Sequence, residues 1–363
     1  MRLFLLLIFL FVCQMPTQAA DMPAGWPWHG VSLDNLSSSP ADIEKFQQEL
    51  GINVVRLQLK PVKLAKRKKI TADLAWSESI AWLDLMLDEC SRLKVKGIVN
   101  LSHFPFDAKY PQIQVAQYTP EFWSDQEQLN GVVQTVTTLM KDLRKRGGEF
   151  AAIDIMSEPA VQHGKDLLIP MNWHELMRKV IASIRSERPD VWIFVSPPPL
   201  GAPPAYSGFE PFSDKFIIYN AHMYIPYSFA AQGIGRKKFG IKYPGKISGK
   251  VWNVDELKKV VEPLRDFQIR NDVPVMIGEF SAIRWADGGG QYVKDLASIF
   301  DEYGWSWIYF SGTGWHGWNP DYNQHYSGQD KTGNWQKDYV GDHSERWKTL
   351  REIFAVKQKS VAP

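Results

Sequence analysis

The sequence has 363 residues, of which 44% are hydrophobic and 23% are charged, as in an ordinary globular protein with a full core. The formal net charge of +2 is too small for a general nucleic-acid-binding protein, so we expect no nucleic-acid partner. Fifteen tryptophans and thirteen tyrosines are many for this length. Aromatic side chains stack against flat sugar rings, which mildly favours a carbohydrate ligand.

The amino terminus has the pattern of a targeting segment. Arg2 is followed by an apolar run over residues 3–13 and by the small-residue sequence Pro-Thr-Gln-Ala-Ala at residues 16–20. The apolar run is too short to span a bilayer. We therefore expect a signal peptide over residues 1–20, export of one domain over residues 21–363 (extracellular or periplasmic), and no stable membrane anchor after cleavage.

The cysteine count favours a fold without disulfides. Cys13 leaves with the signal peptide, and the mature chain then keeps only Cys90, which is expected to be inert core packing. Export without disulfides is compatible with a large core. We expect a monomer.

Short apolar runs alternate with segments of helical spacing along the chain. Strands are predicted over residues 30–33, 52–59, 98–101, 151–156, 191–195, 216–219, 275–279 and 305–310. Helices are predicted over residues 40–50, 76–93, 125–143, 173–186, 254–269, 291–303 and 343–355. Ser38 or Ser39 would cap the first helix and Gly51 would end it, while Gly97 would close the turn after the second.

Eight short strands separated by helices predict an α/β fold, a (β/α)8 TIM barrel in a single domain. The alternative, a doubly wound sheet, normally has a glycine-rich turn after its first strand, and none follows Val31. No linker, composition break or internal repeat divides the mature chain.

Two of the predicted strands end in a glutamate. The run over residues 151–156 leads to Glu158, and Pro159 cannot donate to a sheet ladder, so the strand ends there. The run over residues 273–278 leads to Glu279. The carboxyl ends of barrel strands meet at one face, where such barrels hold their chemistry. Two carboxylates there suit glycosidic cleavage, in which one protonates the leaving oxygen and the other attacks the anomeric carbon.

Four further polar side chains lie at strand ends, namely Arg56, His103, His222 and Tyr224. Arg56 would help to keep one glutamate ionised, and the others can orient a carboxylate or a sugar hydroxyl. Alternatives are an ordinary buried ion pair for Arg56, core packing for the two histidines, and packing with a bonded hydroxyl for Tyr224.

The order of these residues resembles glycoside hydrolase family five over about residues 28–355. The matching segments are Arg56, His103, Ser157-Glu158-Pro159, His222-Met223-Tyr224 and Gly278-Glu279-Phe280. The resemblance implies a retaining mechanism, with Glu279 as nucleophile and Glu158 as acid/base. Neither a metal nor another cofactor is expected, since no His-Glu-x-x-His motif or phosphate loop is present.

Ser157 departs from the family pattern, in which an asparagine hydrogen-bonds the hydroxyl beside the reacting carbon. Serine is shorter, so the same contact needs a water or a shifted sugar. This departure bears on rate and sugar preference more than on the reaction itself.

The family often places a tryptophan of the eighth strand under the central sugar. Five aromatic residues compete for that place here, namely Trp305, Trp307, Phe310, Trp315 and Trp318. We assign Trp307 and Trp315 as candidates for substrate binding, with core packing as the alternative for Trp315. A register error of one residue would reverse the choice on the strand.

These patterns predict an endo-acting hydrolase of a β-linked polysaccharide, with β-glucan as the first substrate. Mannan, xyloglucan and β-1,3-glucan are alternatives within the family. Other classes are a catalytically weak barrel that binds polysaccharide and a barrel enzyme of unrelated chemistry. Basic clusters at residues 60–69 and 236–250 are either solvated loops or contacts for an acidic surface or polymer.

Overall fold

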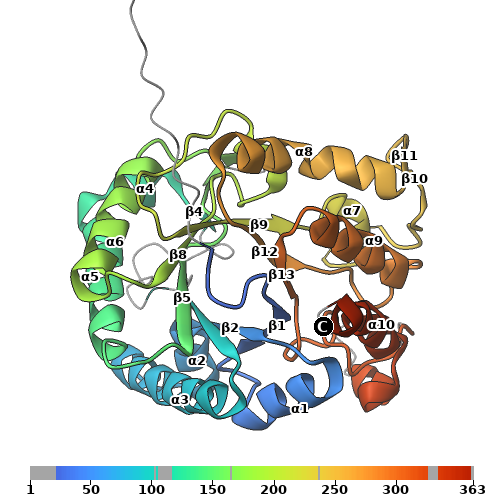
Figure 1. Ribbon diagram of the computed structural model, residues 1–363, viewed down its shortest axis with the longest axis horizontal. Coiled ribbons are helices and arrows are strands. Elements are labelled where there is room, and N and C mark those ends of the chain that lie inside the picture. Colours follow the sequence, from blue (N-terminus) through green and yellow to red (C-terminus); the bar gives the residue numbers. More distant parts are fainter. Residues whose placement is uncertain are drawn as a thin grey trace, which may run out of the picture.

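The protein forms a closed barrel of eight parallel strands surrounded by helices (Figure 1). This computed structural model describes residues 22–101, 104, 117–163, 166–235, 238–325 and 334–360. The barrel strands are β1 (His29–Asp34), β2 (Val54–Leu59), β3 (Lys96–Leu101), β5 (Phe150–Ile155), β8 (Trp192–Val195), β9 (Ile217–Met223), β12 (Val275–Phe280) and β13 (Ser306–Tyr309). They follow one another around the wall in chain order, which confirms the predicted (β/α)8 barrel.

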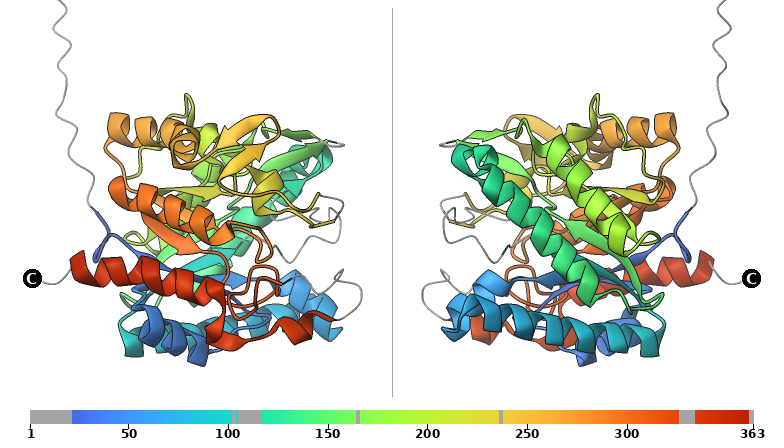
Figure 2. Two further views of the ribbon diagram at one scale, coloured as in Figure 1. Left: turned by 90° about the vertical axis from the view of Figure 1, so that its right-hand side faces the viewer. Right: turned by 90° about the vertical axis from the view of Figure 1, so that its left-hand side faces the viewer.

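Helices cover the outside of the barrel, with α8, α9 and α10 on one side and α3, α5 and α6 on the other (Figure 2). The helices are α1 (Pro40–Leu50), α2 (Pro61–Lys68), α3 (Ala72–Leu93), α4 (Pro120–Ser124), α5 (Gln126–Asp142), α6 (Trp173–Glu187), α7 (Tyr227–Ala230), α8 (Val254–Asn271), α9 (Gly289–Glu302) and α10 (Glu345–Ser360). Among the described helices, none is long and apolar enough to cross a membrane.

Two small sheets lie in the connections that follow barrel strands. A three-stranded sheet joins β4 (Gln117–Tyr118), β6 (Ala160–His163) and β7 (Asp166–Leu168). A hairpin joins β10 (Gly245–Ile247) to β11 (Lys250–Trp252). Because β6 and β7 come directly after β5, the first of these sheets borders the end of the strand that leads to Glu158.

The first helix begins and ends where the sequence predicts. Ser39 is the N-cap of α1, and its backbone N–H donates to the Asp42 carboxylate at 2.7 Å in a reciprocal capping box. Gly51 ends the helix with a φ of 67°, in the left-handed region that glycine adopts without strain.

Three local predictions differ from the structure. Gly97 lies inside β3, and α3 instead ends at Lys94, which takes the left-handed conformation with a φ of 57°. The basic residues predicted as a loop form α2, which Pro61 begins. The strand predicted over residues 216–219 continues to Met223 and therefore carries His222 inside the barrel wall.

The barrel interior is built in layers, because alternate residues of each strand point inward. The layer nearest the amino-terminal ends of the strands is apolar. It contains Trp28, Val54, Ile98, Ala152, Trp192, Phe194, Ile218, Met276 and Ile308. Two residues further along the strands the layer becomes polar, with buried Arg56, Asn100, Asp154 and Asn220. The apolar layer fills the barrel at the amino-terminal ends of the strands. The polar layer lies between it and the carboxyl-terminal ends of the strands.

Candidate active site

A bulge in β12 directs Glu279 into the barrel. Ile277 and Glu279 pair with consecutive residues of β9, so Gly278 is an extra residue that β9 does not match. Met276 belongs to the inner layer, and strict alternation would turn Glu279 outward. The inserted Gly278 reverses this direction, and Glu279 joins the polar residues at the barrel mouth.

The bulge position leaves no space for a side chain. A Cβ atom on Gly278 would stand 2.3 Å from Oδ1 of Asn220. The Asn220 amide is fixed in turn, because its Nδ2 donates to Oγ of Ser196 at 2.9 Å within the buried layer. Packing therefore requires glycine here, immediately before the catalytic candidate.

Three side chains donate hydrogen bonds to the Glu279 carboxylate. Arg56 Nη1 and Gln58 Nε2 reach Oε1 at 2.7 and 3.3 Å, and the Tyr224 hydroxyl reaches Oε2 at 2.9 Å. Arg56 also donates through Nε to Oδ2 of Asp154 at 2.9 Å. Both oxygens of Glu279 are thus held by donors on β2 or at the end of β9.

These neighbours hold Glu279 in its ionised form. Burial alone would raise the pKa of Glu279, but the charges of His222 and Arg56 and the hydrogen bonds from Tyr224 and Arg56 outweigh it. The pKa of Glu279 therefore lies below its ordinary value. A buried, ionised carboxylate with both oxygens oriented is suited to nucleophilic attack.

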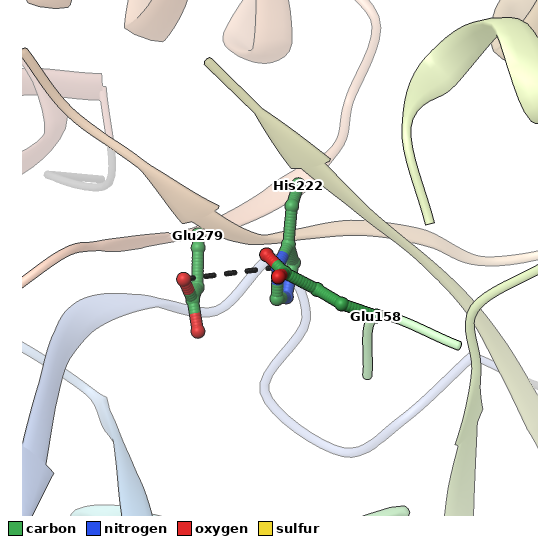
Figure 3. A group of neighbouring side chains, drawn as sticks. All are labelled: Glu158, His222 and Glu279. Carbon is green, nitrogen blue, oxygen red and sulfur yellow. Dashed lines mark hydrogen bonds and ion pairs between the residues drawn. The ribbon is translucent and has the colours of Figure 1, made fainter. Parts of the chain in front are cut away.

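Glu158 lies opposite Glu279 and has a different partner. Its Oε1 is 2.8 Å from Nδ1 of His222, and the same nitrogen is 3.7 Å from Oε2 of Glu279. One carboxylate oxygen of each glutamate and a His222 nitrogen lie within 4.8 Å of one another. Figure 3 shows the three side chains converging from three separate segments of the barrel.

His222 is held between the two carboxylates. Burial alone would lower the pKa of His222, but the charges of Glu279 and Glu158 and the hydrogen bond to Glu158 outweigh it and raise the pKa. A histidine and two carboxylates at this spacing are also a set that can hold a cation, although the contacts above engage the same atoms.

Of the residues that the sequence singled out, Arg56, Glu158, His222, Tyr224 and Glu279 come together in one site. The adjoining Ser157 is fully buried directly before the acid/base candidate. His103 lies outside the described residues.

The assignment of Trp307 to the substrate pocket needs correction. Its ring is fully buried against Phe354 of α10 at a centroid distance of 4.9 Å, and its Nε1 donates to Asp301 at 2.9 Å. Alternation explains the difference, because Ile308 occupies the inner layer and its neighbour Trp307 must point outward to the helices.

Other aromatic rings of this region reach the site. Phe310, which follows β13, and Trp318 lie 6.4 and 5.7 Å from the Tyr224 ring, measured between centroids. Trp315 lies 6.3 Å from Trp318 and is 37% exposed. Trp315 therefore stands at the rim of the site, where the ring can meet a sugar.

The sequence analysis missed three residues of the site. Gln58 could have been found from Arg56, because two residues along a strand point to the same face. Asp154 is an acid inside an apolar strand and so demands a buried cation. Tyr227, at the start of α7, carries no such signal, yet burial and the charge of Glu158 raise the pKa of its hydroxyl.

Known proteins share this sequence pattern and this fold. Endoglucanase C of Acetivibrio thermocellus is 21% identical over 254 residues, covering 62% of this chain and 70% of that protein. Endoglucanase Cel5A of Thermotoga maritima has a TM-score of 0.64 at 18% identity, covering 90% of this chain and 96% of that one.

A hyperthermophilic endo-β-1,4-glucanase, solved in complex with substrate, has a TM-score of 0.65 at 19% identity, with 89% of this chain and 96% of that chain covered. These structural likenesses concern the fold. The family model described as Cellulase (glycosyl hydrolase family 5) matches residues 16–315, most of the chain. The chain therefore belongs to glycosyl hydrolase family 5 and is a glycoside hydrolase, as its motifs predicted.

Proposed function

We propose that this hydrolase cleaves β-linked glucan at internal bonds with retention of configuration, using Glu279 as nucleophile and Glu158 as acid/base. The observation that carries the proposal is the unequal surroundings of the two carboxylates. Glu279 accepts hydrogen bonds from Arg56, Gln58 and Tyr224, whereas Glu158 contacts the single histidine His222. Donors that favour ionisation surround the carboxylate that must attack.

The spacing of the carboxylates supports retention. Oxygens of Glu158 and Glu279 lie within 4.8 Å of each other. Retaining glycosidases hold their carboxyl groups about 5–5.5 Å apart, whereas inverting enzymes need about 6.5–9.5 Å to admit a water beside the sugar. The pocket is thus of a size for direct attack by Glu279.

The reaction follows in two displacements. Glu279 attacks the anomeric carbon, the bond from that carbon to the glycosidic oxygen breaks, and Glu158 gives its proton to the departing oxygen. Water then attacks the glycosyl ester, Glu158 takes a proton from that water, and the Glu279 carboxylate is released. His222 orients Glu158 through both steps, and Arg56 balances the charge of Glu279 before and after attack.

The substrate class is supported by the relatives. Endoglucanase C and the endo-β-1,4-glucanase named above act on β-glucan according to their names. Mannan is the second candidate, because Thermotoga maritima Cel5A has been solved in complex with mannotriose as well as with cellobiose. Xyloglucan and β-1,3-glucan remain further alternatives.

The amino-terminal pattern complements this assignment. We propose that residues 1–20 are a signal peptide, that the remaining chain is secreted as a monomer, and that its polymer substrate lies outside the cytoplasm. Intact-mass measurement of the secreted protein tests the cleavage position, and the unprocessed mass would contradict the proposal.

The test of function is hydrolysis of β-glucans and β-mannans by residues 21–363, beside Glu158→Gln and Glu279→Gln. We expect sugar release by the parent and a loss of about 10²–10⁴-fold or more in each variant. Proton NMR of the first product should show the β anomer. An α anomer would contradict the mechanism, and binding without hydrolysis by all three proteins would favour the binding barrel.

A further inference from the structure

We propose that an arm beside the active site, formed by α2 and by the connections after β1 and β2, binds carboxylate groups of the substrate. The preferred polymer is then an acidic β-linked polysaccharide. This inference rests on the function proposed above and names the class of its substrate.

The arm begins next to the reaction centre. Arg56 and Gln58 are consecutive inward residues of β2, and both donate to Glu279. Lys60 follows the last residue of β2 and is the N-cap of α2. The cations of residues 60–69 therefore begin at the end of the strand that carries Arg56 and Gln58.

Lys60 is paired at the mouth of the barrel. Its Nζ lies 2.6 Å from Oδ2 of Asp34, and the two side chains are 15% and 13% exposed. The other oxygen of Asp34 accepts from the Ser37 hydroxyl and the Leu36 backbone N–H. One carboxylate is thus already satisfied by one ammonium group and two local donors.

Lys63 brings a second ammonium group to the same place. Lys63 lies three residues after Lys60 in the first turn of α2, and partial burial of its amino group and the charge of Lys60 lower its pKa. No carboxylate of the described residues pairs with Lys63, and its side chain remains exposed. Two cations share one acid, and a carboxylate from a ligand would balance the second.

The outer part of the arm offers further cations and a cavity. Lys66 and Lys69 are exposed, and in the described parts of the chain no carboxylate pairs with them. A cavity of about 480 Å³ adjoins α2 and is lined by Arg67, Ser37 and Trp82 among others, and its one acid, Glu78, is paired with Lys68 at 2.6 Å. Arg67 is oriented there by a 2.8 Å hydrogen bond from Nη1 to the Leu36 carbonyl. Hydroxyls, a guanidinium and an indole together suit an acidic sugar.

The position of the cations favours a binding role over that of ordinary surface charges. The cations lie in the connection after β2, at the barrel face that carries the two glutamates, and Lys60 and Lys63 both stand at the beginning of α2. A nucleic acid or an anionic membrane would also attract cations, but the net charge of +2 does not favour either as a general partner. A glycan bound at the two glutamates lies at the same face of the barrel as the arm.

The experiment compares polymers with one backbone and different charge. Carboxymethyl cellulose is anionic, hydroxyethyl cellulose is neutral, and cellulose oxidised at C6 carries the carboxylate on the sugar itself. We expect the parent to have the higher kcat/KM on the anionic polymers. The double variant Lys63→Gln/Lys66→Gln should lower the anionic-to-neutral ratio about three- to tenfold, as for partly screened charges. Preference for oxidised over carboxymethyl cellulose assigns the carboxylate to the ring, and the reverse assigns it to a substituent.

A matched control removes equal charge elsewhere. Lys141 and Lys145 are exposed near the amino-terminal end of β5, away from the cleft, and Lys141→Gln/Lys145→Gln should leave the ratio unchanged. A parent ratio near one, or an equal fall in the control, would overturn the proposal. In 1 M salt the parent ratio should approach one, because the Debye length falls to about 3 Å.

Binding separates this inference from the function on which it rests. In affinity electrophoresis, Glu279→Gln should be retarded more by carboxymethyl than by hydroxyethyl cellulose. Addition of Lys63→Gln/Lys66→Gln should remove the difference. This outcome supports the arm even if the parent hydrolyses neither polymer. Equal retardation by both polymers, or equally tight retention by DNA or by phosphatidylserine vesicles, would overturn it.

Discussion

Arg56 of β2 and Glu279 of β12 form a 2.7 Å ion pair across the barrel, although β1 and β13 separate their strands in the wall. The two side chains are 0% and 11% exposed. The same guanidinium lies 2.8 Å from Oδ2 of Asp154, whose side chain is also fully buried. One cation therefore balances two carboxylates inside the barrel.

Replacing Arg56 with methionine should destabilise the fold. Arg56→Met leaves Asp154 and Glu279 without their cation, and breaking a buried pair in this way costs about 3–5 kcal/mol. Urea unfolding at pH 7 measures the loss. The double variant Arg56→Met/Asp154→Asn should recover part of it, and equal stabilities of the parent and Arg56→Met would contradict the ion-pair interpretation.

The cost of Arg56→Met should shrink in acid. Because the pKa of Glu279 is lowered in the folded protein, its ionisation stabilises the fold above the unfolded value of about 4.3. That contribution is lost as the pH falls through the folded pKa. Unfolding series between pH 3 and pH 7 should therefore bring parent and variant closer together at the acidic end.

Removing the Tyr224 hydroxyl should move the acidic limb of the pH–activity profile. The hydroxyl donates to ionised Glu279 at 2.9 Å, and Tyr224→Phe removes a hydrogen bond that lowers the pKa of Glu279. The acidic limb of the kcat/KM profile should therefore move to higher pH, because Glu279 then ionises at a higher pH. An alkaline limb that moves by the same amount would argue against an effect on Glu279 itself.

Adding one methyl group at Gly278 should displace Glu279. The new Cβ would stand 2.3 Å from Asn220 Oδ1, so either the bulge or the amide must shift. Misplacement of a catalytic group by about 1 Å can cost roughly 10²-fold, and we expect such a fall in kcat for Gly278→Ala. Gly278→Ala/Asn220→Ser removes the clash and should recover part of the activity. No recovery would mean that glycine is needed for backbone freedom instead.

Trp307 and Trp315 should respond oppositely to substitution. Trp307→Phe loses the bond to Asp301 and part of a buried ring, so it should cost about 1–3 kcal/mol of stability with little change in KM. Trp315→Ala removes a ring at the rim, and should leave stability nearly unchanged while KM rises about fivefold. Thermal unfolding and steady-state kinetics on both variants test the pair, and a raised KM for Trp307→Phe would restore it to the pocket.

The strand ends were the most predictable part of this protein. Glu158 and Glu279 each follow an apolar run, and the order of the eight runs brings both to one barrel face. Period-two alternation also relates Arg56 to Gln58. These features depend on local pattern and strand order, which the sequence contains directly.

What the sequence did not reveal depends on backbone irregularity or on contacts between distant segments. The bulge at Gly278 reverses the direction of Glu279, and no alternating pattern announces such an insertion. The sequence indicated that residues of the last strand alternate between inward and outward directions. It did not indicate where the strand begins, so either Trp307 or Ile308 could have pointed inward. Lys94 ends α3, and Gly97 lies inside β3, where a Cβ atom would stand 2.7 Å from Cδ2 of Leu87 of the preceding helix.

The residues that contact Glu279 and the residues at the edge of the site belong to different parts of the fold. The three donors to Glu279 are Arg56 and Gln58 of β2 and Tyr224, which directly follows β9. Substitutions at these positions also disturb folding. The cations of α2 and the ring of Trp315 stand on connections whose replacement leaves the wall intact. Substitutions in these connections should therefore alter the proposed polymer contacts without disturbing the residues that surround Glu279.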